Sequence, residues 1–253
     1  MQASPQCVVL AGGLGKRMRP LTDAMPKNML PVAGRPFAEH QLEFLIANGI
    51  EDIVYLIGYH GDKIREYFGD GKRWNVRIRY ADEAMHLRGT AGALRLAFEN
   101  DLLDSAFFVV YGDSFTPVPM QYVWNAFQAS SMPALMTVLC NEGRWDRSNI
   151  LYENNRIVVY DKTGRDPQSA RMRHIDYGLS VLDRAVVAER VPTTWPADLS
   201  AVFAELSREG KLAAFEANRK FYEIGSPSGL TDFQSYLRES GTRVLQDVLG
   251  DRP

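Results

Sequence analysis

The sequence has few of the residues that form disulfide scaffolds, zinc clusters or covalent nucleophile sites. It has two cysteines, Cys7 and Cys140, and four histidines among 253 residues. Both cysteines lie in apolar, strand-like runs, so we expect buried thiols rather than a disulfide. No Cys/His spacing typical of a metal site and no Ser-His-Asp or Cys-His grouping is present. The sequence therefore offers no support for a zinc-dependent or covalent mechanism.

Long apolar runs and an excess of one charge are also missing. No apolar run reaches the roughly 18 residues of a membrane span, and the first residues lack the apolar core of a signal peptide. Lys and Arg (29) nearly balance Asp and Glu (31), giving a net charge of −2. Nothing therefore indicates a nucleic acid or a membrane surface as a partner. We expect a cytoplasmic protein with a small anionic ligand.

Apolar residues make up 45% of the chain, which is enough for one large core. In the first half, helical and strand-like patterns alternate. Strands are expected over 7–11, 52–57, 76–80 and 107–111, and helices over 37–48, 61–68 and 91–99. This order predicts an α/β fold with a Rossmann-like, mostly parallel sheet flanked by helices.

The second half is richer in strands joined by short polar links. We expect strands over 134–139, 150–152, 157–160, 177–182, 212–215 and 221–224, and helices over 198–208 and from about 227 to 237. The whole chain, 1–253, is expected to be one domain. Residues 7–130 would form its first half and 131–237 a smaller, β-rich second half. Residues 238–253 would form a tail, and we expect residues 1–5 and the tail beyond about 240 to be frayed.

A glycine-rich loop with cations follows the first expected strand. Glycines let the backbone approach a bulky anion and aim N–H groups at it, and neighbouring cations neutralise phosphate charge. The expected nucleotide-binding residues here are Leu10, Ala11, Gly12, Gly13, Gly15, Lys16 and Arg17. Arg19 and, after a proline, Lys27 add two further cations. The pattern predicts a site for a nucleoside triphosphate.

Two better-known phosphate loops do not fit. A Walker A loop requires Gly-Lys followed by Ser or Thr, but Arg17 follows Lys16, and Leu10 stands where the first glycine belongs. A dinucleotide-binding turn requires Gly-x-Gly-x-x-Gly, but Met18 occupies the third glycine position. The remaining alternative is a glycine-rich turn with surface cations.

The long pattern Gly-Gly-x-Gly-x-Arg-Met-x-Pro-Leu-Thr, followed by Pro-Lys, resembles the signature of the sugar-1-phosphate nucleotidyltransferases. These enzymes join a nucleoside triphosphate to a sugar 1-phosphate and release pyrophosphate. Many members carry Thr where this chain has Lys16. The segment Pro-Lys-x-Met-Leu-Pro-Val-x-Gly-x-Pro-Phe and the later His-Ile-Asp-Tyr-Gly are most similar to the heptose- and mannose-1-phosphate guanylyltransferases. The resemblance thus implies GTP and a heptose 1-phosphate as substrates.

Two acidic residues are candidate ligands for Mg²⁺. Asp113 follows Gly112 at the end of a buried strand, and Mg²⁺ prefers one or two carboxylates together with phosphate oxygens. A turn-capping aspartate is the alternative. The resemblance places a metal-binding Asp in this motif. It places a second acid at Glu223, where the family has Asp in an aromatic-x-Asp-Ile-Gly-Thr-Pro segment.

The base is expected to lie near a segment of small residues that includes Gly89 and Thr90, where a flat ring can approach the backbone. Thr90 could instead cap the following helix. Related enzymes carry Gln or Glu near the position of Glu83 to recognise the base. A glutamate there could accept hydrogen bonds from the N1–H and amino group of guanine, or could be a surface acid.

The sugar phosphate is expected to contact a second set of residues. The pair Asp161-Lys162 resembles the family's acidic-Lys pair, whose Lys meets the sugar-bound phosphate. The segment Asp176-Tyr177-Gly178 resembles the start of a sugar-binding strand. Asn149, with Arg144 and Arg147, could bind sugar hydroxyls or belong to a solvated loop. The full expected set is Gly112, Asn149, Lys162, Tyr177 and Gly178.

The implied chemistry needs no general base, because a sugar 1-phosphate with a second pKa of about 6 is already anionic at neutral pH. Arg17, Lys27 and Asp113 are the expected catalytic residues, with Mg²⁺ on Asp113. The first half, 7–130, would then bind the nucleotide and the second half, 131–237, the sugar phosphate. Alternatives that stay open are a uridylyl-, cytidylyl- or thymidylyltransferase acting on another sugar 1-phosphate, such as N-acetylmuramate or glucose 1-phosphate, a non-catalytic nucleotide-sugar sensor, and a module acting on phosphocholine or a phosphonate. Whether the chain forms a homodimer also stays open.

Overall fold

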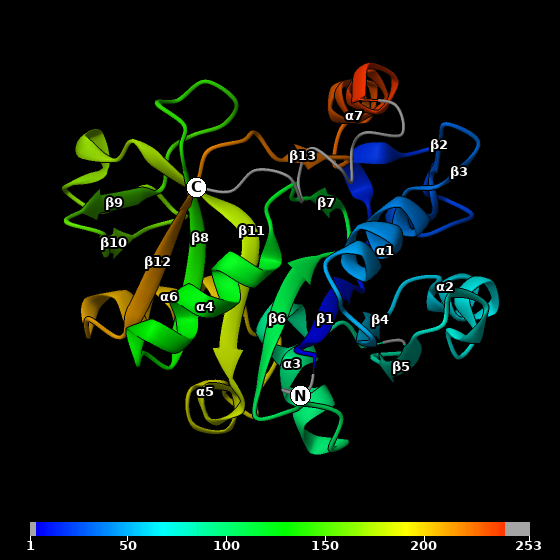
Figure 1. Ribbon diagram of the computed structural model, residues 1–253, viewed down its shortest axis with the longest axis horizontal. Coiled ribbons are helices and arrows are strands. Elements are labelled where there is room, and N and C mark those ends of the chain that lie inside the picture. The colour runs from blue at the N-terminus through cyan, green and yellow to red at the C-terminus, as the bar shows by residue number, and fades with distance from the viewer. Residues whose placement is uncertain (1–3, 85, 241–253) are drawn as a thin grey trace.

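A computed structural model describes residues 4–84 and 86–240. Its centre is a nine-stranded sheet that runs through both halves of the chain (Figure 1). In spatial order the strands are β5 (Arg77–Asp82), β4 (Asp52–Ile57), β1 (Gln6–Ala11), β6 (Ala106–Tyr111), β11 (His174–Asp183), β8 (Ala134–Cys140), β12 (Leu212–Ala217), β10 (Arg156–Tyr160) and β9 (Ile150–Glu153). The first four strands are mutually parallel, and β11 joins them antiparallel to β6.

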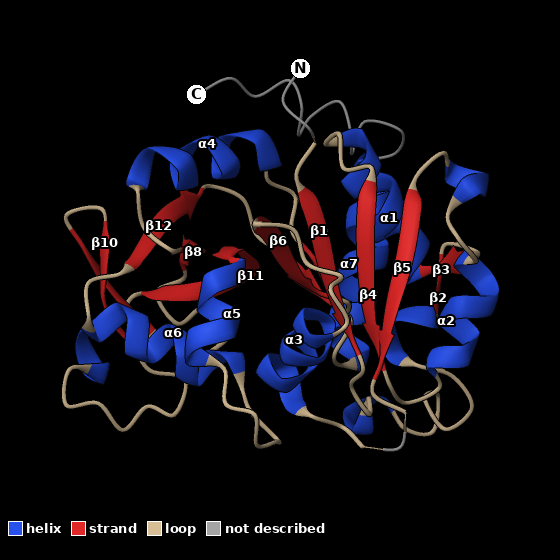
Figure 2. Cartoon of the chain, turned by 90° about the horizontal axis from the view of Figure 1, so that it is seen from below, coloured by secondary structure: helices blue, strands red, loops and turns tan. Residues whose placement is uncertain are grey.

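Helices cover both faces of the sheet, as the alternation of helices and strands predicts. The helices are α1 (Phe37–Ala47), α2 (Gly61–Phe68), α3 (Gly89–Glu99), α4 (Met120–Ser130), α5 (Arg184–Arg190), α6 (Leu199–Arg208) and α7 (Pro227–Ser240). Figure 2 shows α4 and the α5–α6 pair on opposite sides of β8 and β12. The core has two clusters: α1, α2, α4 and α7 pack on one face, and α3, α5 and α6 pack on the other. The predicted fold class is confirmed.

The central strands bury both of their faces because they are apolar throughout. On β1, Cys7 and Val9 belong to the first cluster and Val8 to the second, and all three are fully buried. Alternate side chains of a strand point to opposite faces, so a continuous apolar run fills both layers. Along β11, too, successive side chains point to opposite faces of the sheet.

Most expected elements are present with ends shifted by a few residues. Helices α4 and α5 were not expected. Helix α4 begins after Pro119, which offers no side-chain cap, and it carries no acidic residue in its first turn. It therefore lacks the usual sequence signals of a helix start. Strand β11 begins three residues before the expected start at Tyr177, and its register shifts between Asp176 and Ser180.

The expectation for the cysteines is half right. Cys7 is buried and Cys140 is exposed, and neither forms a disulfide. Cys140 is the last residue of β8, where the chain leaves the sheet. It is therefore exposed, although the residues before it in the strand are buried and mostly apolar. Among the described helices, none combines the length and the apolarity needed to cross a membrane. Of the segments expected to be frayed, 1–3 and 241–253 lie outside the described residues. Residues 238–240, which were counted with the tail, belong to α7.

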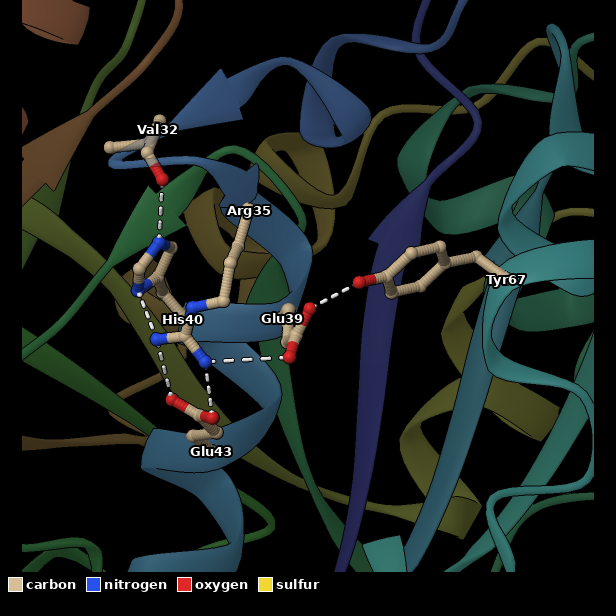
Figure 3. A network of polar contacts seen from close by, with 6 residues as sticks. All are labelled: Val32, Arg35, Glu39, His40, Glu43 and Tyr67. Carbon is tan, nitrogen blue, oxygen red and sulfur yellow. Dashed lines mark hydrogen bonds and ion pairs between the residues drawn. The ribbon is translucent and has the colours of Figure 1, made fainter. Parts of the chain in front are cut away.

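A polar network fastens a small hairpin to α1 (Figure 3). The hairpin consists of β2 (Pro31–Val32) and β3 (Arg35–Pro36) and directly follows the Lys27–Met29 turn. Arg35 contacts Glu43, Glu39 and the Nδ1 atom of His40. The Nε2 atom of His40 lies 2.9 Å from the Val32 carbonyl oxygen. Arginine can only donate and a carbonyl can only accept, so this geometry requires neutral His40 with the proton on Nε2.

We expect the network to make stability depend on pH. Burial, with the Arg35 charge, lowers the pKa of His40 below its ordinary 6.5, so the unfolded chain takes up this proton at a higher pH than the folded chain. This contribution is intact above pH 6.5 and is lost as the pH falls below it. Titration of this one group changes the free energy of unfolding by at most about 1.4 kcal/mol per pH unit. Thermal unfolding between pH 7 and pH 5 should lose stability more steeply in the unmodified chain than in His40→Gln. Parallel curves would contradict this assignment.

Candidate functional site

A first cavity of about 310 Å³ opens at the carboxyl ends of β1, β4 and β6. Parallel α/β sheets place their ligands at this edge. Its lining includes ten of the residues expected from the sequence: Leu10, Ala11, Gly12, Gly13, Lys27, Glu83, Gly89, Thr90, Gly112 and Asp113. The glycine-rich loop, the small-residue segment and the strand-end aspartate are thus brought together.

Glycine at position 12 allows Glu83 to lie directly against the loop. A Cβ at Gly12 would lie 2.4 Å from the Glu83 Oε2 atom, so a side chain there would displace the carboxylate. Glu83 is 7% exposed, and its Oε1 accepts the Arg88 backbone N–H at 2.7 Å. Burial raises the pKa of Glu83 above its ordinary value. Glu83 is therefore a buried acceptor in the cavity wall, which rules out the surface-acid alternative.

Thr90 joins α3 to the second half of the chain. Its hydroxyl lies 3.2 Å from the Asp198 carboxylate and accepts the Leu199 backbone N–H at 2.8 Å. It therefore contacts the start of α6 and does not cap its own helix. Gly89 has φ +76°, and a Cβ there would lie 2.4 Å from the Ala197 carbonyl oxygen. Only glycine fits this close approach.

A second cavity of about 450 Å³ lies on the other side of Asp113. It contains six of the expected site residues: Arg17, Asp113, Asn149, Lys162, Gly178 and Glu223. Its wall is more polar than that of the first cavity and carries charges of both signs. One of its carboxylates, Asp176, accepts the Gly178 N–H at 2.9 Å and the Tyr160 hydroxyl at 3.2 Å. Burial raises the pKa of Asp176, and the positive charge of Lys162 opposes that rise.

Asp113 and Tyr111 line both cavities, so the cavities meet at the end of β6. Asp113 forms an ion pair with Lys27, and both side chains are mostly buried. A Cβ at Gly225 would lie 3.0 Å from Arg17 Nη2 and 3.7 Å from Asp113 Oδ2. The guanidinium of Arg17 therefore lies near the same carboxylate. All three expected catalytic residues converge on one point.

Glu223 reaches this point through a short strand pair. Strand β13 (Tyr222–Glu223) pairs antiparallel with β7 (Ser114–Phe115), with Glu223 opposite Ser114 (Figure 1). The Ile224 N–H also donates to the Asp113 carbonyl oxygen at 2.9 Å. Burial raises the pKa of Glu223, and the negative charge of Asp113 raises it further. Two carboxylates thus repel each other at the junction, with Lys27 and Arg17 as the neighbouring cations.

Some expected residues lie elsewhere. Tyr177 is fully buried in the core and lines neither cavity, because it faces the side of β11 opposite Asp176. Gly112 lines the first cavity instead of the second. Gly15 and Lys16 line neither. Gly15 has φ +60°, and its carbonyl accepts the Thr22 hydroxyl at 2.9 Å, which shapes the loop from outside.

Sequence reasoning missed two supporting residues. Asn28 lines the first cavity and is 3% exposed, and neither of its side-chain polar atoms has a partner among the described residues. Its only signal was its place directly after Lys27. Gln41, on α1, donates from Nε2 to the carbonyl oxygens of Tyr111 at 2.9 Å and Ser114 at 2.6 Å. It braces the turn that carries Asp113, and no local pattern marks it.

Trp145 and Lys220 were also missed. Both line the second cavity, and Trp145 is 43% exposed, which is unusual for so large an apolar side chain. The Lys220 ammonium lies 5.8 Å from the centre of the Trp145 ring and pairs with Asp232 at 2.7 Å. An exposed aromatic ring among polar groups is suited to one apolar face of a polar ligand.

Curated relatives match nearly the whole chain. A mannose-1-phosphate guanyltransferase of Neurospora crassa is 27% identical over 248 residues, which cover 95% of this chain and 67% of the relative. The mannose-1-phosphate guanylyltransferase catalytic subunit beta of Xenopus tropicalis is 28% identical over 236 residues, covering 92% of this chain and 65% of the relative. The chain thus spans about two thirds of the length of these relatives.

Solved structures share the fold. HddC from Yersinia pseudotuberculosis complexed with GMP-PN is 20% identical, with a TM-score of 0.75, covering 92% of this chain and 100% of that one. A putative glucose-1-phosphate thymidylyltransferase from Bacillus anthracis is 21% identical, with a TM-score of 0.79, covering 92% and 95%. Residues 6–147 match the family described as nucleotidyl transferase. The chain therefore belongs to the nucleotidyl transferase family of enzymes, which confirms the resemblance seen in its sequence.

Proposed function

We propose that this protein transfers a nucleotidyl group from a nucleoside triphosphate to a sugar 1-phosphate and releases pyrophosphate. The observation that carries the proposal is the junction of the two cavities at Asp113. One cavity has a glycine-rich wall suited to phosphates and a flat base, and the other is polar and has an exposed tryptophan suited to a sugar. A reaction between the two ligands would take place where both cavities share a residue.

The proposed step joins two anions. An oxygen of the sugar phosphate forms a bond to the α-phosphorus, and the bond from that phosphorus to the bridging oxygen of the β-phosphate breaks. Pyrophosphate carries away the electron pair. The protein must position the reactants and offset their charge. Arg17 and Lys27 supply positive charge at the junction, and Gln41 fixes the turn beneath it.

The residues at the junction fit Mg²⁺. Asp113 and Glu223 offer oxygen donors, and a dication would relieve the repulsion that raises the pKa of Glu223. We propose that these two residues hold the ion. When bound, Mg²⁺ supplies Lewis-acid polarisation of phosphate oxygens. Glu223 has one more methylene than the aspartate expected from the resemblance, so its contact can also be through a water.

For the base we propose guanine, and for the sugar a manno-configured 1-phosphate. The curated relatives are named as mannose-1-phosphate guanyltransferases, which supports both choices. The sequence resemblance also includes heptose-1-phosphate guanylyltransferases, so a manno-heptose 1-phosphate is the first candidate and mannose 1-phosphate the second. Glu83 supports guanine, because a buried carboxylate acceptor matches the two adjacent N–H donors of that base.

Glu83→Gln should weaken the preference for GTP. The amide keeps the shape but offers one oxygen acceptor and one NH₂ donor, which faces the guanine donors unfavourably. We expect kcat/KM for GTP to fall about 10- to 100-fold, the size of one or two lost charge-assisted hydrogen bonds. The rates with the other triphosphates should change less. An unchanged ranking of GTP, ATP, UTP, CTP and dTTP would contradict the role of Glu83.

Lys162→Ala should mainly raise KM for the sugar phosphate. Lys162 lines the second cavity and not the first, so its charge is available to the phosphate of the acceptor. We expect an increase of about 10-fold or more, typical of a lost charge-assisted contact. Lys211→Ala is a matched control, because this lysine pairs with Glu209 and lines neither cavity. An increase confined to KM for the nucleotide would show that Lys162 does not contact the sugar phosphate, contrary to the proposal.

The direct test is a panel of GTP, ATP, UTP, CTP and dTTP against several sugar 1-phosphates, with Mg²⁺ present and pyrophosphate release as the readout. The proposal expects turnover that requires both substrates and is fastest with GTP and a manno-configured sugar. If turnover were fastest with another pair, the proposed reaction would stand, but the proposed base or sugar would be wrong. Binding of nucleotide without pyrophosphate release from any pair would favour a non-catalytic sensor.

A further inference from the structure

Three side chains of metal-binding type meet at the end of β8, outside both cavities described above. Cys140, His174 and Glu216 each offer one ligand atom, and these atoms all lie within 4.8 Å of one another. They come from β8, β11 and β12, which are adjacent in the sheet. None of the three lines either cavity of the proposed active site.

Strand register explains why the three side chains share one face. Cys140 lies opposite His174, and Glu216 lies opposite Val138, two residues before Cys140 on the same side of β8. The two β8 pairings are among the most extensive in the sheet, so the backbone fixes the spacing of the three Cβ atoms. Sequence spacing could not reveal this group, because each residue comes from a different strand.

The imidazole is held in place. The side chain of His174 is 13% exposed, its Nε2 atom lies 2.9 Å from Glu216 Oε1, and its ring centre lies 4.7 Å from that of Tyr152. Cys140, by contrast, is an exposed free thiol. A separate cavity of about 380 Å³ borders His174, so a solvent ligand can approach from that side.

The donor set selects a class of ion. A thiolate, an imidazole and a carboxylate together suit Zn²⁺ and similar borderline ions, whereas Mg²⁺ prefers oxygen alone. In tetrahedral zinc sites with bonds of about 2.0–2.3 Å, ligand atoms lie roughly 3.3–3.8 Å apart. Small side-chain rotations would bring the three atoms from their present separation to that range. The side chains of Glu216 and Cys140 are exposed, so both can rotate in this way.

We propose that Cys140, His174 and Glu216 form a binding site for a divalent transition metal of the zinc class, with a solvent molecule as the fourth ligand. Binding converts the Cys140 thiol to a thiolate and releases its proton to solvent. The ion would link β11, β8 and β12 at one point. Because β11 continues from His174 to Asp176 and Gly178, the linked segment also forms part of the second cavity wall.

The test is metal binding by the full chain, with Mg²⁺ in excess to occupy the Asp113 region. We expect calorimetry to show one saturable Zn²⁺ site and Co²⁺ to produce a thiolate-to-cobalt charge-transfer band. Cys7 is fully buried, so this band reports Cys140. Cys140→Ser should remove the band and weaken Zn²⁺ binding by about 100-fold or more, at or above the effect of losing an outer-shell partner.

Two further site variants and one control complete the test. His174→Ala should weaken binding as much as Cys140→Ser, and Glu216→Gln should weaken it by about 10-fold or more. Glu205→Gln changes another exposed acid, on α6, and should leave binding unchanged. Circular dichroism of the metal-free variants shows whether each one folds. Absence of saturable Zn²⁺ binding in the unmodified chain, or equal affinity in folded Cys140→Ser, would overturn the proposal. Neither result depends on nucleotidyl transfer.

Discussion

Replacing Asp113 with alanine should lower kcat for pyrophosphate release by about 100-fold or more, the scale of a preorganised electrostatic contact at a reacting centre. Asp113 lines both cavities and faces Lys27, Arg17 and Glu223. Its loss removes one proposed Mg²⁺ ligand and leaves Lys27 without its ion-pair partner. Both changes weaken charge compensation where the new bond would form.

The Asp113 measurement needs a variant that separates chemistry from folding. Asp113→Asn keeps the shape of the side chain and removes its charge, so it should also lose activity while unfolding at a similar temperature. Asp104→Asn is a matched control at an exposed aspartate outside both cavities and should keep full activity. If Asp113→Asn retained native kcat at saturating Mg²⁺, Asp113 would not be a catalytic residue.

Arg17→Ala is expected to have the second large effect, again about 100-fold or more in kcat. Arg17 follows the glycine-rich loop, lines the second cavity and lies beside the Gly225 backbone near Asp113. A guanidinium there can hold two phosphate oxygens at once and so stabilise the departing pyrophosphate. Removing it should affect kcat more than KM for either substrate, because the charge on the leaving group grows during the reaction.

Arg17→Lys tests the geometry of this contact. A lysine keeps the charge but loses the two-pronged donor set, so we expect it to recover only part of the lost rate. Arg19→Ala is the control, because Arg19 is exposed, pairs with Asp23 and lines neither cavity. If Arg19→Ala and Arg17→Ala had equal effects, the loop cations would act through overall charge and not through a specific contact.

Local sequence patterns predicted the fold well because the strands are apolar on both faces. Strand β4 (Asp52–Ile57) and helix α2 (Gly61–Phe68) have the predicted ends, since apolar periodicity and a closing glycine determine them locally. Helix α4 was missed because its packing against β8, β11 and β12 stabilises it more than any signal in its own sequence. Tertiary contacts of this kind cannot be inferred from one segment.

The site could be predicted where it follows strand ends, and less well elsewhere. Asp113 and the glycine-rich loop were found because they come directly after β6 and β1. Tyr177 was placed in the site because the motif that includes it was identified without knowing which face of β11 it occupies. That face depends on how β11 pairs with β6 and β8, and the register with β8 shifts between Asp176 and Ser180.

Gln41 and the Cys140 group show a further limit. Each acts through residues far away in the sequence: Gln41 holds a turn 70 to 73 positions later in the chain. Cys140 meets His174 and Glu216 only through the order of strands in the sheet. Such juxtapositions become visible only when the topology is known.

The most direct test of the central claim is a crystal structure of this protein with Mg²⁺, a non-hydrolysable GTP analogue and a manno-configured sugar 1-phosphate. The account predicts the triphosphate along the glycine-rich loop, the sugar in the cavity beside Lys162, and the α-phosphorus next to Asp113 with the sugar phosphate opposite the leaving group. A sugar phosphate bound far from Asp113, or a nucleotide outside the first cavity, would contradict it.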